Sequence, residues 1–400
     1  MSKSWGGEPE AGVIAGGFKT CVPEAALANG TMAHALDYDD YWVSGIGHPT
    51  AVLLPAILAL GEKDKISGRD IIAAYVVSCE VGSKLASLVA TSLLERGWHP
   101  TGVLGALAAA AACAKILKLN VEETRIALGI AASETGGLRK NFGTDTKPLH
   151  AGKAASNGIV AAMLAKRGFT ASQDILEGPI GFCRTLAGMD YQAAPVLEKL
   201  GSPYDILSAA TIKPYPSCGG THRCIDAMLH LVKEHHLRAE DVAEIQCKTF
   251  TLLPEILIYH HPKTGLEGKF SMEYVMAAAL LDGEITLKQF TEEKVLNTKA
   301  QEIFQRVKYI HPKPVPGEAE IRHELPQTVT VKLRDGRQYF HEVPYPKGHP
   351  KNPLIWEEVG DKFRDCSRLA ISPRQAERCI DLVSALESLK DISELMVIIT

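Results

Sequence analysis

Residues 101–114 read TGVLGALAAAAACA, and this apolar run is the clearest indication of fold class in the chain. Seven of its fourteen residues are alanine, and none is charged. Small side chains let neighbouring helices approach closely, and a helix without a polar face is buried on every side. The run therefore predicts a central helix of a buried helical bundle.

Helical patterns continue on both sides of this run. Ser67 and Asn120 precede two of them as N-caps, because their side-chain oxygens can accept hydrogen bonds from free backbone N–H groups. We expect helices over residues 24–36, 51–60, 68–90, 102–117, 121–133, 152–165 and 173–177.

The pattern changes after about residue 207, where Pro203, Pro214 and Pro216 break any helix. Alternating residues predict strands over 242–250, 328–333 and 338–343, and Asp335-Gly336 is a typical hairpin pair between the last two. Helices are expected over 271–281, 287–296, 299–307, 356–366 and 373–389. The chain is predicted to be mainly α, with a large all-α helical domain (1–208 plus 347–400) interrupted by a smaller α+β lid domain (209–346).

The composition excludes several classes of protein. The 400 residues are 46% apolar and 22% charged, which is typical of a folded chain with large cores. A formal charge of −4 argues against general affinity for nucleic acid or anionic membranes. The longest apolar run is shorter than the roughly 20 residues of a membrane helix, and residues 1–17 lack the apolar core of a signal peptide. Nine scattered cysteines without a C-x-x-C pair fit a reducing cytoplasm.

The segment His34-Ala-Leu-Asp37-Tyr-Asp39-Asp40 places three carboxylates at the end of a predicted helix. It is either a solvated acidic loop or a site in which one aspartate orients a base. Carboxylates also suit Mg²⁺, so a magnesium-dependent enzyme of isoprenoid-synthase type is a competing interpretation. That interpretation requires a second acidic motif, which the sequence lacks.

His48-Pro49 and His99-Pro100 each place a histidine before a proline at the start of an apolar helix. Proline favours extended backbone in the residue before it, so each ring should project from its loop. The helix N-terminus behind each ring offers free N–H groups to an anion. The alternative is that both histidines are ordinary packed loop residues.

Two lysines lie in loops that are unusually polar for their surroundings. Lys147 lies between two apolar helices, and Lys213 begins Lys213-Pro-Tyr-Pro-Ser-Cys218 at the predicted domain junction. A lysine ammonium suits a carboxylate or phosphate, although both loops could also be surface turns. Cys218 is a candidate nucleophile or an inert packed thiol.

No P-loop, H-E-x-x-H, G-x-S-x-G or Rossmann motif is present. The lysines, histidines and aspartates therefore predict a site that binds a small polyanion and moves protons.

Taken in order, these segments resemble the MmgE/PrpD family across nearly the whole chain. That family includes 2-methylcitrate dehydratase, cis-aconitate decarboxylase and iminodisuccinate epimerase, which act on small polycarboxylates. The resemblance implies a helical domain with an α+β lid, a homodimer, and no metal or organic cofactor. The matching stretches are Ala28-Asn-Gly-Thr-Met-Ala-His-Ala-Leu-Asp-Tyr-Asp-Asp40, Gly47-His-Pro-Thr50, Gly97-Trp-His-Pro-Thr-Gly102, Thr146-Lys-Pro-Leu-His-Ala-Gly152, Lys213-Pro-Tyr-Pro-Ser-Cys218 with Thr221-His222, and Gly268-Lys-Phe-Ser-Met-Glu-Tyr274.

The resemblance also implies the site residues. The implied catalytic residues are Asp37, His48, His99, Lys147 and Lys213. The implied substrate-binding residues are Lys147, Lys213, Cys218, His222 and Tyr274.

Three features depart from the family pattern. Tyr41 stands where the decarboxylases often have threonine, and Cys218 stands where they have histidine. These changes favour a cofactor-independent lyase of 2-methylcitrate dehydratase type. An epimerase, a decarboxylase and a catalytically silent carboxylate-binding protein are the alternatives. Family members also have a helical stretch before the position of Gly6, so the chain is a short natural variant or lacks part of its N-terminus.

Two geometric expectations follow for the site. Lys147 and Lys213 should converge from opposite sides of the domain junction, with their nitrogens within about 10 Å. Their charges should repel until a dianion closes the lid. His99 is the predicted base, with Asp37 orienting it or sharing its proton and His48 polarising a carboxylate.

Overall fold

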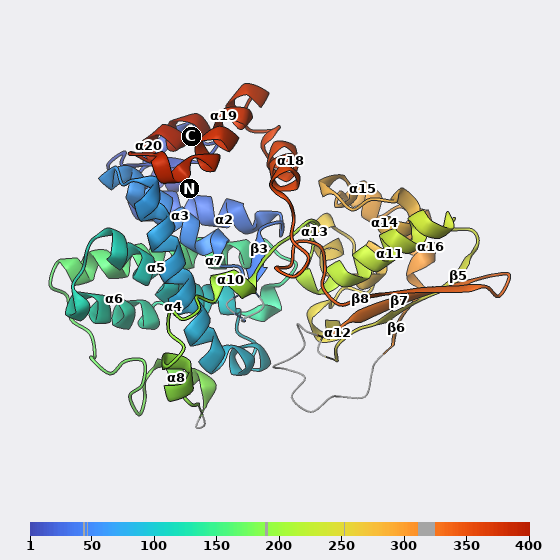
Figure 1. Cartoon of the computed structure of the whole chain (residues 1–400), viewed down its shortest axis with the longest axis horizontal. Coiled ribbons are helices and arrows are strands. Elements are labelled where there is room, and N and C mark those ends of the chain that lie inside the picture. The colour runs from blue at the N-terminus through green and yellow to red at the C-terminus, as the bar shows by residue number, and fades with distance from the viewer. Residues whose placement is uncertain (43–44, 46, 189–190, 252, 311–324) are drawn as a thin grey trace.

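A computed structural model of the protein describes residues 1–42, 45, 47–188, 191–251, 253–310 and 325–400 (Figure 1). Helices dominate these residues and the sheets are small, so the prediction of a mainly α fold is confirmed. Residues 311–324 of the predicted lid lie outside the described residues.

The first half of the chain contains long helices and four three-residue strands. Its elements are α1 (Ser2–Trp5), β1 (Ala11–Val13), β2 (Phe18–Thr20), α2 (Val22–Ala35), β3 (Asp40–Trp42), α3 (Thr50–Asp64), α4 (Gly68–Glu95), α5 (Pro100–Ile116), α6 (Val121–Ser133), η1 (Arg139–Asn141), α7 (Thr146–Lys166), α8 (Phe182–Ala187), α9 (Ala194–Leu197), α10 (Ile206–Ala209) and β4 (Ala210–Ile212). Strands β1 and β2 pair antiparallel, as do β3 and β4.

The second half mixes helices with one four-stranded sheet. Its elements are η2 (Gly219–Thr221), α11 (His222–His235), β5 (Val242–Lys248), α12 (Leu253–Ile256), α13 (Gly265–Gly268), α14 (Met272–Asp282), η3 (Leu287–Gln289), α15 (Glu292–Val295), α16 (Thr298–Phe304), β6 (Val307–Ile310), β7 (Gln327–Leu333), β8 (Gln338–Val343), α18 (Trp356–Ser367), α19 (Pro373–Ser384), η4 (Leu386–Ser388) and α20 (Ser393–Ile399). The strand order is β6-β5-β7-β8, with β5 and β6 parallel and the other neighbours antiparallel.

Most predicted elements form where local signals are strong. The helix predicted over 121–133 has the observed bounds of α6, and Asn120 and Glu123 complete a capping box at its start. The hairpin between β7 and β8 turns at Gly336, which has a φ of 89°. The helix predicted over 173–177 is wrong, because this short polar stretch forms turns. The helix predicted over 287–296 is broken into η3 and α15.

The described residues form two hydrophobic cores. One core joins α2–α7 and includes Cys379, Leu382 and Leu389 near the C-terminus. The other joins α11, α14 and the four-stranded sheet. Figure 1 shows the corresponding two bodies side by side, with the C-terminal helices beside the N-terminal ones. The domain boundaries, and movement of the second body as a lid, stay predictions.

Helix α5 lies at the centre of the first core. Every residue from Pro100 to Ile116 except Lys115 is buried, as the alanine-rich run predicts. Helix α4 is long and apolar enough to cross a membrane by length and composition alone, but 56% of that window is buried inside the protein. Buried core helices pass the same test, so this finding is weak evidence for a membrane span.

The crossing of α2 and α7 places the ends of both helices together. A Cβ on Gly30 of α2 would lie 2.9 Å from the Cα of Gly152 in α7, so neither helix can carry a larger residue there without moving apart. Asp37 follows the end of α2, and Lys147 lies in the first turn of α7. The close crossing therefore brings these two side chains to one place.

Candidate active site

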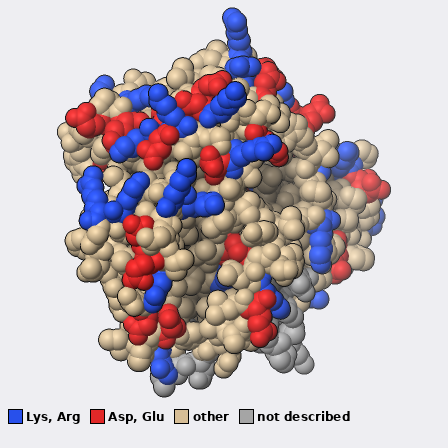
Figure 2. Space-filling model, turned by 60° about the vertical axis from the view of Figure 1, so that its left-hand side comes forward, with Lys and Arg blue, Asp and Glu red and all other residues tan. Residues whose placement is uncertain are grey.

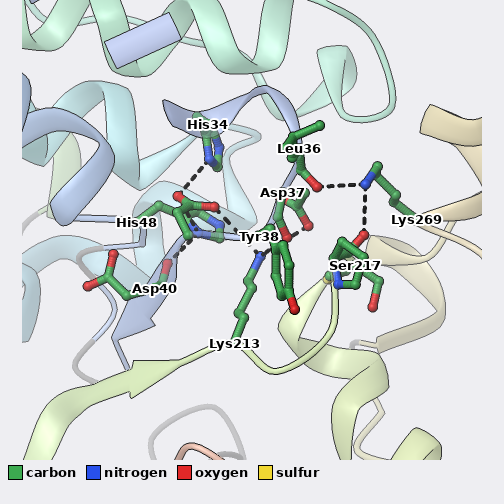
Figure 3. Close-up of polar contacts among 12 residues, drawn as sticks. His34, Leu36, Asp37, Tyr38, Asp40, His48, Lys213, Ser217 and Lys269 are labelled. Carbon is green, nitrogen blue, oxygen red and sulfur yellow. Dashed lines mark hydrogen bonds and ion pairs between the residues drawn. The ribbon is translucent and has the colours of Figure 1, made fainter. Parts of the chain in front are cut away.

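Asp37 is buried and contacts two lysines, Lys147 and Lys213. Figure 3 shows Lys213 beside Asp37. The Nζ of Lys147 donates a hydrogen bond to Oδ1 of Asp37. The Nζ of Lys213 lies 3.1 Å from Oδ2 and donates to the backbone carbonyl of Asp37 at 2.9 Å. The structure thus brings Lys147 and Lys213 to the same carboxylate.

The local backbone explains how these three residues meet. Asp37 has a φ of 50°, a left-handed conformation that turns the chain sharply after α2. The chain then enters β3, which pairs with β4, and Tyr41 lies opposite Thr211. Lys213 directly follows β4, so this short pairing carries it back to Asp37.

The charges of Asp37 and Lys213 remain fixed near neutral pH. Burial opposes ionisation of Asp37, but Lys147 and Lys213 outweigh it and hold the carboxyl pKa well below its usual range. Burial likewise lowers the pKa of Lys213, but Asp37 and Asp39 raise it further, so the net shift is upward. The expected repulsion between the two lysines is absent, because Asp37 stands between them and compensates their charge.

Three histidines lie beside this trio. The ring centroids of His34 and His48 are 4.4 Å apart, and His99 lies 5.9 Å from His34 and 6.4 Å from His48. Thr101, two residues after His99, ties the two histidine loops together by accepting a hydrogen bond from the backbone N–H of His48. A Cβ on Gly47 would lie 2.3 Å from the Thr101 Oγ1, so this contact requires glycine.

The hydrogen bonds of His34 and His48 define their tautomers. Asp39 is an acceptor at 2.8 Å from Nδ1 of His34, and the Asp40 carbonyl is an acceptor at 2.8 Å from Nδ1 of His48. Each Nδ1 must therefore carry the proton. Burial lowers the pKa of His34 to about 4, which leaves its Nε2 as a bare acceptor. That Nε2 has no hydrogen-bond partner among the described residues.

His99 is the N-cap residue of α5 and has extended backbone, as the following proline predicts. Burial holds its pKa well below the usual range, and Lys147 and the neighbouring histidines add to this effect. The expected pairing of His99 with Asp37 is wrong, because the two lysines hold Asp37. His150 is the partner instead, with 3.1 Å between the two Nδ1 atoms.

Cys218 and His222 lie in the segment that follows Lys213. Burial and Asp37 raise the pKa of the Cys218 thiol, which disfavours a nucleophilic thiolate. His222 is fully buried, and its Nε2 lies 3.2 Å from the Ser217 carbonyl. Burial lowers the pKa of His222 to about 3, with Lys213 adding to the shift. Both residues thus belong to the surroundings of Lys213.

The structure does not bring Tyr274 together with the other predicted site residues. Tyr274 is buried in the second core, where its ring contacts Phe290 and Phe304. Its hydroxyl donates to the Gln289 carbonyl. The family motif that ends at Tyr274 places a different residue at the site, because Lys269 of the same motif reaches the Asp37 turn.

Some of these side chains lie close enough together to hold a metal ion. Among the described residues, two sets have donor atoms within 4.8 Å of one another: His34, His48 and His99, and His34, Asp37, Asp39 and His48. The carboxylates of the second set already have partners, because Asp37 binds two lysines and Asp39 binds His34. Asp40 accepts from Trp42 and Thr50. The three carboxylates therefore do not converge as a magnesium site requires.

Sequence analysis missed several residues that shape this site. His34 and His150 lie within the quoted motifs, but no spacing rule distinguishes them from packed histidines. Phe142 and Phe270 flank Lys147, with their ring centroids 5.6 and 5.2 Å from its Nζ. Such cation–π contacts come from segments far apart in sequence, so no local signal indicates them.

The buried neutral histidines predict loss of stability in acid. Their folded pKa values lie below the unfolded value of about 6.5, so the unfolded chain binds more protons as the pH falls from 6.5 to 4. Each such histidine should lower the free energy of unfolding by up to about 1.4 kcal/mol per pH unit in this window. Urea unfolding at a series of pH values should show a shallower slope for His34→Gln. His230→Gln, at an exposed histidine, should keep the wild-type slope.

Comparison with known proteins identifies the family of this chain. The MmgE/PrpD N-terminal domain matches residues 1–193, and the MmgE/PrpD C-terminal domain matches residues 215–388. Cis-aconitate decarboxylase from Homo sapiens is 32% identical over 382 residues, covering 93% of this chain and 78% of that protein. The Mus musculus protein is 33% identical, covering 94% and 78%, and the Aspergillus terreus protein is 28% identical, covering 96% and 82%. Two family domains in order along the chain, and relatives that span nearly all of it, show that this chain belongs to the MmgE/PrpD family.

Proposed function

We propose that this chain is a cofactor-independent lyase that acts on a small di- or tricarboxylate by proton transfer at a carbon next to a carboxylate. The observation that carries the proposal is the meeting of Lys147 and Lys213 at Asp37, directly beside three histidines. Cations stabilise the negative charge that builds up on a substrate carboxylate. A neutral histidine accepts a proton and, once protonated, can deliver it.

Five residues supply this chemistry in the proposed site. Lys147 and Lys213 would bind substrate carboxylates, with Asp37 holding both ammonium groups in place until the substrate arrives. His99 is the proposed proton-transfer residue, because it is neutral and Pro100 fixes its loop at the start of α5. His150 would orient the imidazole of His99.

Decarboxylation is the first reaction to test, because relatives named cis-aconitate decarboxylase align with 93–96% of this chain. In that reaction the bond to one carboxylate breaks, CO₂ leaves, and the electron pair spreads over the remaining unsaturated acid. A proton from the enzyme then forms a new C–H bond. The lysines would stabilise the charged intermediate, and His99 would pass to it a proton that the imidazole has first taken up from solvent.

Dehydration of a 2-methylcitrate-type substrate is a second candidate, favoured by two residues near Lys213. Tyr41 and Cys218 stand where the decarboxylase pattern has threonine and histidine. The Tyr41 ring lies at the edge of His222, and Cys218 adjoins Gly219, whose added Cβ would lie 2.9 Å from Tyr41. These larger or less polar groups change the shape of the site next to Lys213. An epimerase or a silent carboxylate-binding protein would require the same lysines.

A polycarboxylate panel tests the proposal. Purified protein is incubated with cis-aconitate, 2-methylcitrate and iminodisuccinate, each with and without EDTA, and the products are identified by mass spectrometry. We expect turnover of at least one acid at a rate that EDTA leaves unchanged. Thermal shift is measured in parallel, because a ligand at 100 times its Kd stabilises the fold by about 2.7 kcal/mol. Binding without turnover would indicate a silent binding protein, and loss of turnover in EDTA would indicate a metal enzyme.

A further inference from the structure

Two further lysines hold the turn around Asp37 from outside. The Nζ of Lys269 donates to the backbone carbonyls of Leu36 at 2.6 Å and Pro216 at 2.9 Å (Figure 3). The Nζ of Lys362 donates to the carbonyls of Tyr38 at 2.6 Å and Lys213 at 2.8 Å. Each ammonium therefore joins the Asp37 turn, residues 36–38, to the Lys213 loop, residues 213–216.

The two lysines reach this place from different parts of the chain. Lys269 directly follows α13 in the second body, and Lys362 lies in α18 near the C-terminus. Each Nζ also lies over an aromatic ring, Phe290 at 4.6 Å and Tyr38 at 4.2 Å from the centroid. Both ammonium groups thus have the same set of contacts: two carbonyls, one from each loop, and one ring face.

Two of the four carbonyls lie on either side of Asp37. The Leu36 carbonyl belongs to the peptide group directly before the left-handed residue, and the Tyr38 carbonyl belongs to the second peptide group after it. Single residues in such conformations are energetically unfavourable and persist when their surroundings determine them. On the opposite loop, the held carbonyls of Lys213 and Pro216 restrict the backbone that carries Lys213.

We propose that Lys269 and Lys362 are positioning residues that fix the Asp37 turn against the Lys213 loop, so that the Asp37 carboxylate stays between Lys147 and Lys213. The hydrogen bonds of both ammonium groups go to backbone carbonyls, so each lysine acts through the backbone of another residue. Lys269 belongs to the second body and Lys362 to the C-terminal helices. The geometry of the site would therefore depend on both of these parts of the chain.

The use of lysine supports a positioning role over simple packing. Burial lowers the pKa of each lysine to about 8, which records the unfavourable placement of the charge. Replacing buried charged residues by apolar residues of similar size often leaves the stability of a protein unchanged or raises it. A protonated amine, however, offers charge-assisted hydrogen bonds, which are roughly twice as strong as neutral ones. Those bonds hold two carbonyls at once.

The test uses Lys269→Met and Lys362→Met, with Lys84→Met as the matched control. Lys84 is also buried, but its ammonium contacts Asp205 and Glu80 in the first body. Two quantities are measured: steady-state kinetics on the acid that the wild type turns over, and amide hydrogen exchange by mass spectrometry. We expect Lys269→Met and Lys362→Met each to lower kcat at least tenfold and to change KM less than threefold. Exchange should speed up in peptides covering residues 36–42 and 213–218 but not in α5.

The control and the outcomes separate positioning from general stability. Lys84→Met should lower the unfolding temperature yet keep wild-type kcat and wild-type exchange in both peptides. The proposal would be overturned if Lys269→Met and Lys362→Met kept kcat within twofold of wild type. It would also be overturned if amide hydrogen exchange in both peptides were unchanged. If a methionine variant does not fold, Lys→Gln at that position is measured by the same criteria. The kinetic measurement rests on the proposed function. The amide hydrogen exchange measurement does not, so it decides the proposal even if the wild type turns over no acid.

Discussion

Replacing His99 by glutamine should lower turnover by about 10²–10⁴-fold, because a positioned acid–base residue contributes a factor of that size. Glutamine has a similar length and can retain a hydrogen bond to His150, but it cannot take up a proton. Incorporation of solvent deuterium at the reacting carbon, measured by mass spectrometry in D₂O, should fall by the same factor. Thermal stabilisation by the substrate should remain, because the lysines that bind carboxylates are unchanged.

His230→Gln is the control for this experiment, because His230 is exposed and its ring stacks on His341 in the second body. It should exchange deuterium at the wild-type rate. If His99→Gln also exchanges at the wild-type rate, His99 is not the proton-transfer residue. His34 would then be the next candidate, since its bare Nε2 lies in the same cluster.

Lys213→Met should destabilise the protein by about 3–5 kcal/mol, the typical cost of removing one partner of a buried ion pair. Lys213 has no exposed surface, and its loss leaves the buried Oδ2 of Asp37 without a cation. Urea unfolding at pH 7 measures the change. Turnover should be lost as well, because the proposed site needs both lysines to bind the substrate.

An exposed ion pair and a double variant complete this test. Lys332→Met removes a partly exposed partner of Glu244, for which a loss of about 0–1 kcal/mol is expected. Asp37→Asn combined with Lys213→Met should cost less than the sum of the two single changes, because each single change leaves a buried charge uncompensated. Additive effects, or a Lys213→Met cost below 1 kcal/mol, would contradict a coupled buried pair.

The mixed surface charge agrees with the small net charge of the chain. Figure 2 shows Lys and Arg interspersed with Asp and Glu on one face of the molecule. The notable concentration of positive charge lies inside, where Lys147, Lys213, Lys269 and Lys362 surround one turn. Of these four, Lys147 and Lys213 are the pair proposed to bind a small anionic substrate, which leaves water on binding.

Features that depend on residues a few positions apart could be predicted from the sequence. The alanine-rich run predicts the fully buried α5, Asn120 predicts the start of α6, and Asp335-Gly336 predicts the hairpin. The motifs also name Asp37, His48, His99, Lys147 and Lys213, all of which the structure places in one cluster or in contact with it. Helix periodicity, capping and turn chemistry are local, so a single sequence carries them.

Only the tertiary structure decided which of these groups face one another. Lys147 and Lys213 lie 110 and 176 positions from Asp37, and Lys362 lies 324 positions from the Tyr38 carbonyl that it holds. Their meeting depends on the close crossing of α2 and α7 and on the pairing of β3 with β4. For the same reason His99 pairs with His150 instead of Asp37, and Tyr274 lies in the second core. A buried charge takes the partner that the folded chain brings within reach, and no local pattern specifies that partner.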